Sequence, residues 1–532
     1  MNKNYVIQYN PSKERMFYMK KIIAVILSAV MLFSICAPAA FASDECDCGV
    51  LPTIYVGPLG NTDIYENADT EDERILFRPD TKTIIGIVLK VLPAVITLPI
   101  TRNYDKFADV LIEAVDSAMG AMALDGNGNS YENVSVKIDL PTDPAHGVDR
   151  DYYFHYDWRL DPIEIAGQLD AFIQHVKKLT GHDKVYFRAS SMGGVTAMAY
   201  FSEYGYDDVA GCIFQCCPIL GTSMAGDLLC RKLELNPRAL LDYGVDALPP
   251  VDFGSTLLYF LFNGLYYSGL IDVVYSFAEK LLDELQDKIF DELLTPVFGT
   301  ILGLWAFVPD AVYEEAKAIN LDPETQAGLI AKADYYHYNV QGKAEEILEG
   351  AVDAGLKIMI VAGYDIQATP FIESMENDSD NTVDTIYASV GGTVADYDST
   401  LGEDYVCKAD CGHNHLSPDN RIDASTCVLP EHTWFIKGML HSNCHDGISE
   451  MYKWFLYSDE YYDVWSNPKY PQFLQNDKPN LRVLPMGNFA EGEKAPEYEE
   501  GDSYYDSFNK IAMPVLNKIF AVGDKIRAVF VK

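Results

Sequence analysis

The stretch from residue 184 to 200 constrains the fold more than any other part of the sequence. It opens with three residues that favour β-structure, Val185-Tyr-Phe187, and continues with the small-residue run Ala189-Ser-Ser-Met-Gly-Gly194. Small and apolar residues then follow at helical spacing, so the stretch predicts a strand, a sharp turn and a helix. A serine at such a corner has a strained backbone that lifts its Oγ clear of the sheet. Ser191 is therefore the candidate nucleophile, and an ordinary small-residue turn is the alternative.

The neighbours of Ser191 fit this interpretation. Ala189 and Gly193 are small, as the close packing of strand and helix requires at a nucleophile elbow. The helix that follows directs unpaired N–H groups and the positive end of its dipole at the space above Ser191. A developing oxyanion would be stabilised there, and Met192 would donate the first N–H group.

The N-terminus has the pattern of an export signal. Met19-Lys-Lys21 precedes an apolar run over residues 22–36, and Ala40-Phe-Ala42 has the small residues of a cleavage site. We therefore expect a secreted protein, with residues 1–42 removed by cleavage near Ala42 and the first eighteen residues as an upstream extension. Cleavage would leave 35 basic and 78 acidic residues, a formal charge of −43, which disfavours nucleic acid as a partner.

Ten cysteines remain after this cleavage, and an exported protein with an even number of cysteines is expected to form disulfides. Their pairing stays open. The region of Cys407, Cys411, His413 and His415 also offers donors for a structural zinc ion, as the alternative to disulfides. The cysteines form three clusters: Cys46 and Cys48; Cys212, Cys216, Cys217 and Cys230; and Cys407, Cys411, Cys427 and Cys444.

Apolar strand patterns alternate with helical patterns along most of the chain. This alternation predicts an α/β fold with a mostly parallel sheet covered by helices on both faces. The expected strands include residues 134–140, 152–156, 185–187, 209–216, 356–363 and 433–439, and the expected helices include 104–122, 162–179 and 448–456. Residues 83–100 are expected to form a buried or interfacial pair of helices, because a lysine and two prolines interrupt their apolar run.

The pattern changes three times, which divides the mature chain into four parts. Between residues 227 and 350 it becomes mainly helical, as in a cap or lid inserted into a sheet domain, and no run there is long enough to cross a membrane. The expected boundaries are 43–226 for the first part of the core, 227–350 for the cap, 351–457 for the second part of the core and 458–532 for an acidic linker with a C-terminal helix.

Four motifs together resemble the lecithin:cholesterol acyltransferase and bacterial lipase group of α/β-hydrolases. The resemblance covers about residues 50–226 and 355–457, and three positions depart from it: Ser190 replaces a histidine, Arg188 replaces an apolar residue, and Gly57-Pro58 replaces His-Gly or Pro-Gly. The motifs are Tyr156-Asp-Trp-Arg-Leu160, Ala189-Ser-Ser-Met-Gly-Gly194, Gly205-Tyr-Asp-Asp-Val209 and Pro218-Ile-Leu-Gly-Thr-Ser-Met-Ala225.

This resemblance implies an α/β-hydrolase fold and a triad in the order Ser, acid, His. A serine hydroxyl needs an imidazole to accept its proton and a carboxylate to orient the imidazole. His441 directly follows the expected strand 433–439 and is the predicted base, with His445 as the alternative. Asp380 lies in a stretch similar to the one that carries the acid of the family, and Asp419 is the alternative acid.

The sequence therefore predicts a secreted serine hydrolase of carboxylic esters, with lipid esters as the leading substrate class. Ser191, His441 and Asp380 would form the triad, and the N–H groups of Leu59 and Met192 would form the oxyanion hole. No cofactor or catalytic metal is expected, and transient contact with a membrane surface is possible for such a protein. The alternatives are an esterase of short-chain or glycan esters, an acyltransferase, and a non-catalytic exported binding protein on the same scaffold.

Overall fold

The structure is a computed structural model that describes most of the chain after residue 45. The described residues are 46–77, 90–247, 266–409, 411–441, 445–459, 462–477 and 481–486, except positions 95, 96 and 99, with single residues of 259–264 and 515–524. Residues 48–532 form one compact unit, and the features below belong to it. Among the helices described, none has the length and apolarity needed to cross a membrane.

Eight strands form the central sheet. They are β1 (Thr53–Val56), β5 (Asp151–Phe154), β6 (Val185–Ser190), β7 (Val209–Gln215), β8 (Lys357–Tyr364), β13 (Thr433–Lys437), β14 (Phe473–Asp477) and β15 (Arg482–Pro485). Their order is β15-β14-β13-β8-β7-β6-β1-β5, and every neighbouring pair is parallel except β14 with β15. The prediction of a mostly parallel sheet is confirmed.

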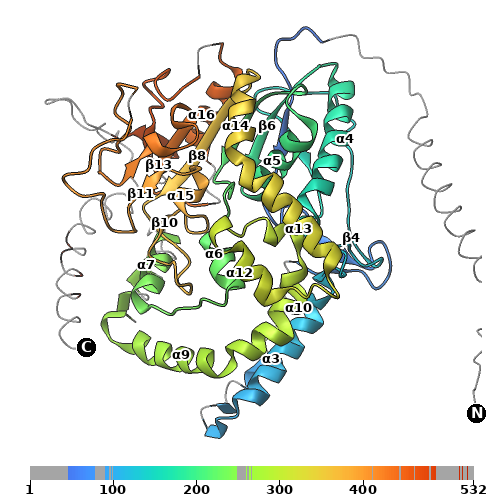
Figure 1. Cartoon of the computed structure of the whole chain (residues 1–532), viewed down its shortest axis with the longest axis vertical. Coiled ribbons are helices and arrows are strands. Elements are labelled where there is room, and N and C mark those ends of the chain that lie inside the picture. The colour runs from blue at the N-terminus through green and yellow to red at the C-terminus, as the bar shows by residue number, and fades with distance from the viewer. Residues whose placement is uncertain are drawn as a thin grey trace, which may run out of the picture. The chain divides into compact units, whose positions relative to one another are not determined.

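Helices cover both faces of this sheet. Successive strand residues point to opposite sides, so neighbours in a strand pack against different helices. Phe187, Phe214 and Ile360 join a core with residues of α4 (Pro162–Thr180), α5 (Met192–Tyr204) and α14 (Ala344–Asp353). A second core forms on the other face with residues of α16 (Asp446–Tyr457). It includes the residue directly before each of these three, namely Tyr186, Ile213 and Met359. In Figure 1 the labels of α5 and α14 accordingly lie beside β6, and that of α16 beside β8.

Local signals in the sequence set the ends of α4, the helix that leads to β6. The Asp161 side chain accepts a hydrogen bond from the N–H of Ile163 at 3.0 Å, and Pro162 occupies the first turn, where its missing N–H costs nothing. Gly181 ends the helix in the left-handed conformation at φ 75°. The chain then turns back at once into β6.

A smaller antiparallel sheet lies outside the central one. It pairs β2 (Ile64–Glu66) with β3 (Arg74–Ile75) and with β4 (Val134–Val136). The strand expected over residues 134–140 is thus only three residues long and is not part of the main sheet. The helix expected over 104–122 is observed as α3 (Tyr104–Met119) followed by η1 (Gly120–Met122).

Between β7 and β8 every named element that the structure describes is helical, as the sequence pattern of 227–350 predicts. Helix α3 packs against α9 of this segment, and both lie at the lower end of the view in Figure 1. Besides α14 the elements are α6 (Ser223–Leu229), α7 (Pro237–Ala247), α9 (Leu270–Ile289), η2 (Phe290–Leu294), α10 (Thr295–Val297), η3 (Phe298–Thr300), α11 (Leu302–Trp305), α12 (Asp310–Asn320), α13 (Ala327–Asn339) and η4 (Gln341–Lys343).

The region after β8 contains short elements that shape the loops of the sheet. They are β9 (Ile366–Gln367), β10 (Asp378–Ser379), α15 (Thr385–Ala388), β11 (Thr393–Val394), β12 (Ile422–Asp423), η5 (Ala424–Thr426) and η6 (Pro430–His432). The interpretation of residues 458–532 as a linker is wrong in one respect. Strands β14 and β15 lie in this segment, so the strand at 433–439 is not the last of the sheet.

Three expectations fall on other parts of the chain. The signal peptide, residues 1–42, lies outside the described residues, as do most of the expected helix pair 83–100 and most of the expected C-terminal helix 508–531. No disulfide joins any of the nine cysteines that the structure describes, so the expected disulfides find no support among them.

Candidate active site

Ser191 occupies a sharp turn between β6 and α5. Its backbone has φ 52° and ψ −121°, a left-handed conformation that a residue with a side chain adopts at a cost. The turn requires glycine at position 193, because a Cβ atom there would lie 1.9 Å from the carbonyl oxygen of Val56 on β1. The observed strand, turn and helix match the nucleophile elbow expected from the sequence.

The structure brings the three predicted side chains together. Nε2 of His441 lies 2.8 Å from Oγ of Ser191, and Nδ1 of the same ring lies 2.8 Å from Oδ2 of Asp380. The three residues follow β6, β8 and β13, which lie close together in the sheet, and the carboxyl ends of parallel strands meet at one edge. Both distances are those of good hydrogen bonds.

Asp380 is fixed as an acceptor. Its side chain is fully buried, and Oδ1 accepts hydrogen bonds from the N–H groups of Thr382 at 3.0 Å and Val383 at 2.8 Å. Its backbone carbonyl accepts the N–H of His441 at 2.8 Å. The two hydrogen bonds to Oδ1 leave Oδ2 directed at the imidazole of His441.

Two opposing effects set the pKa of His441. Burial of the ring lowers the pKa, while the negative charge of Asp380 and the hydrogen bond to it raise the pKa. The second pair of effects is stronger, so the pKa of His441 lies above its ordinary value. This ring therefore binds the proton of Ser191 more tightly than an isolated imidazole would.

The two alternative residues have other partners. Oδ2 of Asp419 lies 2.9 Å from Nζ of Lys437 and accepts a hydrogen bond from the Tyr364 hydroxyl at 3.3 Å. Nδ1 of His445 accepts the N–H of Gly447 at the start of α16, and its Nε2 lies 2.8 Å from Oδ1 of Asn476. The geometry therefore favours Asp380 and His441 over Asp419 and His445.

The two predicted oxyanion donors flank the elbow. Met192 is the first residue of α5, and Leu59 lies in a turn closed by the hydrogen bond from the Asn61 N–H to the Pro58 carbonyl at 3.0 Å. Within the described residues, neither the N–H of Leu59 nor that of Met192 makes a backbone hydrogen bond. Neither N–H group is therefore committed to a backbone acceptor in that part of the chain.

Tyr156 supports this loop and Arg159 forms a buried ion pair, in roles that the sequence did not reveal. The Tyr156 hydroxyl donates a hydrogen bond to the carbonyl of Gly57 at 2.7 Å, which anchors the chain just before Leu59. Arg159 is fully buried and binds both carboxylate oxygens of Asp157, at 2.9 and 2.6 Å. The motif Tyr156-Asp-Trp-Arg159 was the sequence signal, but Tyr156 binds Gly57, 99 positions away, and Arg159 also donates to the Met122 carbonyl, 37 positions away.

Apolar groups and a short helix close over the elbow. A Cβ atom on Gly303 of α11 would lie 2.0 Å from the carbonyl oxygen of Trp158 and 2.5 Å from Cε of Met192, so α11 rests directly on this region. The rings of Phe77 and Trp158 pack edge to face with centroids 4.9 Å apart. Ser191 itself is only 8% exposed.

Arg188, which stands where the resembled motif has an apolar residue, forms a cross-strand ion pair. Its Nη2 lies 2.6 Å from Oδ2 of Asp151 on β5, and its guanidinium lies 4.8 Å from the centre of the Tyr55 ring on β1 between them. The charge is therefore compensated on the sheet, and it does not reach the triad.

The zinc alternative at Cys407, Cys411, His413 and His415 is not supported. Sγ of Cys411 lies 3.3 Å from Nε2 of His415, but Cys407 contacts Asp423 and the His413 ring packs on Trp465. Within the described residues these four donors do not form a group that could hold a metal.

Comparison with known proteins identifies no relative: no protein-family model matches the chain, and no curated protein matches it significantly. The geometry of the site therefore has to support any functional conclusion by itself.

Proposed function

We propose that the chain is a serine hydrolase of carboxylic esters with an α/β-hydrolase fold and Ser191, His441 and Asp380 as its triad. One observation carries this proposal. Ser191 lies in a strained strand-to-helix turn and is hydrogen-bonded through His441 to a buried carboxylate. This arrangement combines a strained backbone at the nucleophile, an oriented base and a fixed acid. Together they serve catalysis directly, and no structural role for the combination is evident.

In the first half of the reaction Oγ of Ser191 attacks the ester carbonyl carbon, and Nε2 of His441 accepts the hydroxyl proton. The carbonyl oxygen becomes an oxyanion that the N–H groups of Leu59 and Met192 would bind. Collapse of this intermediate breaks the bond to the alcohol, and the imidazolium returns its proton to the leaving alkoxide. Asp380 stabilises the imidazolium throughout and stays ionised.

In the second half a water molecule attacks the acyl-enzyme. His441 accepts a proton from the water, and the second tetrahedral intermediate expels Ser191 Oγ, which takes that proton back. The products are the carboxylic acid and a free enzyme. An acceptor alcohol in place of water would make the same machinery an acyltransferase.

Lipid esters are the proposed substrate class. The apolar packing next to the elbow supports this, since Gly303 of α11 lies against the Met192 side chain and the Trp158 backbone, and the Phe77 ring packs on Trp158. The resemblance of the motifs to the lecithin:cholesterol acyltransferase and bacterial lipase group points the same way. The mostly helical segment between β7 and β8 would act as the cap, with α11 as the part that must move to admit a long acyl chain.

The test is hydrolysis of p-nitrophenyl esters from acetate to palmitate by the wild-type chain and by Ser191→Ala. Ser190→Ala is the matched control, because Ser190 is the adjacent buried serine at the end of β6 and no triad contact involves it. We expect activity that rises with acyl length, survives in Ser190→Ala and is lost in Ser191→Ala. A fluorophosphonate probe should label the wild type and the control alone.

The other outcomes are equally informative. Activity on acetate alone would replace lipid esters with short-chain or glycan esters and keep the triad. No labelling and no hydrolysis of any ester would overturn the catalytic proposal in favour of an exported binding protein. Activity that persists in Ser191→Ala would contradict the assignment of the nucleophile.

A further inference from the structure

A second group of reactive side chains lies far from Ser191 in the fold. Cys48, His146 and His182 precede β1, β5 and β6 by three to five residues each. These strands are adjacent and parallel, so their starting ends lie at one edge of the sheet. The triad follows the ends of strands at the opposite edge, and the proposed function uses none of these three residues.

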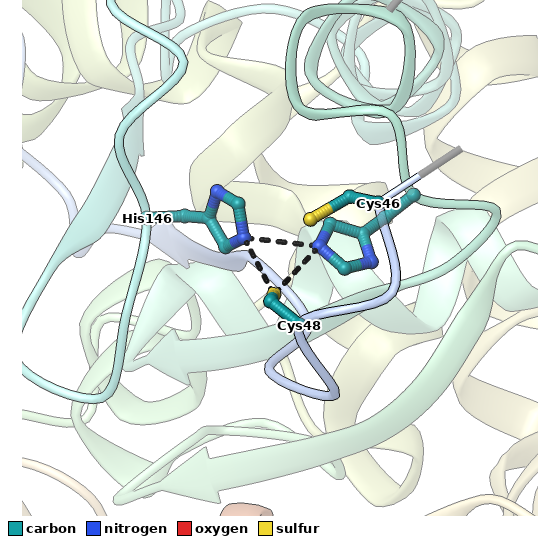
Figure 2. Close-up of side chains that lie close together, drawn as sticks. Cys46, Cys48 and His146 are labelled. Carbon is teal, nitrogen blue, oxygen red and sulfur yellow. Dashed lines mark hydrogen bonds between the residues drawn. The ribbon is translucent and has the colours of Figure 1, made fainter. Parts of the chain in front are cut away.

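The three donor atoms are spaced as ligands of one small cation would be. Sγ of Cys48 lies 3.4 Å from Nε2 of His146 and 3.5 Å from Nε2 of His182, and the two Nε2 atoms are 2.9 Å apart (Figure 2). Zinc binds thiolate sulfur at about 2.3 Å and imidazole nitrogen at about 2.0–2.1 Å with tetrahedral angles. This geometry separates sulfur from nitrogen by about 3.6 Å and two nitrogens by about 3.3 Å.

The orientation of the side chains supports metal ligation. Nδ1 of His146 lies 2.9 Å from the carbonyl oxygen of Pro144, which makes Nδ1 the protonated nitrogen and leaves a lone pair on Nε2. A backbone carbonyl that fixes the tautomer in this way is the usual outer partner of a metal-bound histidine. The N–H of Val50 points at Sγ of Cys48 from 3.5 Å, as donors to a thiolate do.

From this arrangement we propose a structural zinc site that consists of Cys48, His146 and His182, with Cys46 as the fourth ligand. Cys46 precedes Cys48 by two residues, and two residues of chain span at most about 7 Å, so its thiol can reach the same ion. Two thiolates and two imidazoles form a closed tetrahedral set with no position left for water or substrate. Binding releases one proton from each thiol, and both histidines bind as neutral rings.

The ion would attach the start of the mature chain to the sheet. The predicted cleavage site at Ala42 lies four residues before Cys46, so the bound segment is the new N-terminus. His146 belongs to the loop before β5 and His182 to the turn after α4, so one ion would join three segments at the edge of the sheet. An open pocket of 570 Å³ lined by Cys48 and His146 gives an ion access from solvent.

The experiment measures zinc in the full chain by inductively coupled plasma mass spectrometry, and then titrates the chelated, reduced protein with Co²⁺. We expect one zinc per chain, and for Co²⁺ the charge-transfer band of a thiolate ligand with the visible bands of a tetrahedral ion. Loss of an outer partner weakens metal binding about 10- to 100-fold, so Cys48→Ser and His146→Ala should weaken it by about 100-fold or more. Cys411→Ser is the matched control, because this exposed thiol also contacts a histidine.

Each contrary result overturns the proposal in its own way. If the wild type contained no zinc and gave no Co²⁺ spectrum, the cluster would be a hydrogen-bonded group and not a metal site. Unchanged binding in both variants would place the metal elsewhere. A Cys46–Cys48 disulfide in the purified chain, detected by alkylation and mass spectrometry, would exclude the thiolate ligands. The wild-type Co²⁺ titration decides the question even if a variant fails to fold, and ester hydrolysis is not part of any readout.

Discussion

Replacing Asp380 with asparagine should abolish most of the activity and leave the fold intact. Asn keeps the shape of Asp, and its amide oxygen can still accept the N–H groups of Thr382 and Val383 that now bind Oδ1. The amide nitrogen then faces Nδ1 of His441 in place of Oδ2 and donates a hydrogen bond to it. The ring proton moves to Nε2, which can no longer accept the proton of Ser191.

The size of the effect follows from this change of tautomer. The corresponding Asp-to-Asn replacement in a serine protease triad lowers kcat by about 10⁴, which corresponds to about 5.4 kcal/mol in the activation barrier. Because both backbone hydrogen bonds survive, we expect the free energy of unfolding to change by less than about 1 kcal/mol. A large loss of rate with a small loss of stability is therefore the signature of the proposed role.

The assay compares kcat on p-nitrophenyl butyrate with urea unfolding of the same samples. Asp419→Asn is the matched control, because Asp419 pairs with Lys437 and has no contact with the triad. It should keep kcat within a few-fold of the wild type, since only an ion pair away from the ring is lost. If Asp380→Asn kept a tenth or more of the activity while Asp419→Asn lost it, the assignment of the acid would be refuted.

Three further predictions follow from other contacts. On acidification the activity of the wild type should fall at a pH above the ordinary pKa of histidine, because Asp380 raises the pKa of His441 despite burial. In Asp380→Asn only burial acts on the ring, so the residual activity should fall at a lower pH. The pH profiles of kcat/KM test this, and a shift of the variant to higher pH would contradict it. Gly303→Ala should lower the free energy of unfolding by about 1–3 kcal/mol, because the new Cβ would overlap the Trp158 carbonyl. Gly264→Ala is the control and should have no such effect, because nothing lies within 4 Å of its Cβ. Equal thermal midpoints of the two variants would contradict the packing of α11. Arg159→Met leaves the buried Asp157 without its partner and should lower the free energy of unfolding by about 3–5 kcal/mol in urea. Lys469→Met, at an exposed ion pair, should lower it by about 0–1 kcal/mol, and an equally small effect of Arg159→Met would contradict the buried ion pair.

The elbow was predictable from the sequence because its constraints are local. The strand pattern, the small residues and the helix pattern are contiguous around Ser191, and each reflects the steric needs of the turn itself. The order of strands and helices also predicted the parallel sheet. His441 could be placed for the same reason, since it directly follows the last strong apolar strand, β13.

Contacts between distant segments were not predictable in the same way. Asp380 and Asp419 have similar local sequences, and their roles differ because Asp380 contacts His441 whereas Asp419 pairs with Lys437. Strand β14, Phe473–Asp477, is short and ends in polar residues, so its pairing with β13 is visible only in three dimensions. The group of Cys48, His146 and His182 is spread over 134 positions, and the two nearby cysteines were its one sequence signal.

The proposed triad would also determine when this chain becomes active during folding. The hydrogen bond between Ser191 and His441 joins residues 250 positions apart, and it requires β6, β7, β8 and β13 to be paired in order. Closing such a long loop loses chain entropy before any contact compensates, so assembly of the site is a late event in folding. Recovery of activity after dilution from denaturant would therefore follow completion of the sheet, whereas the elbow and its helix can form earlier.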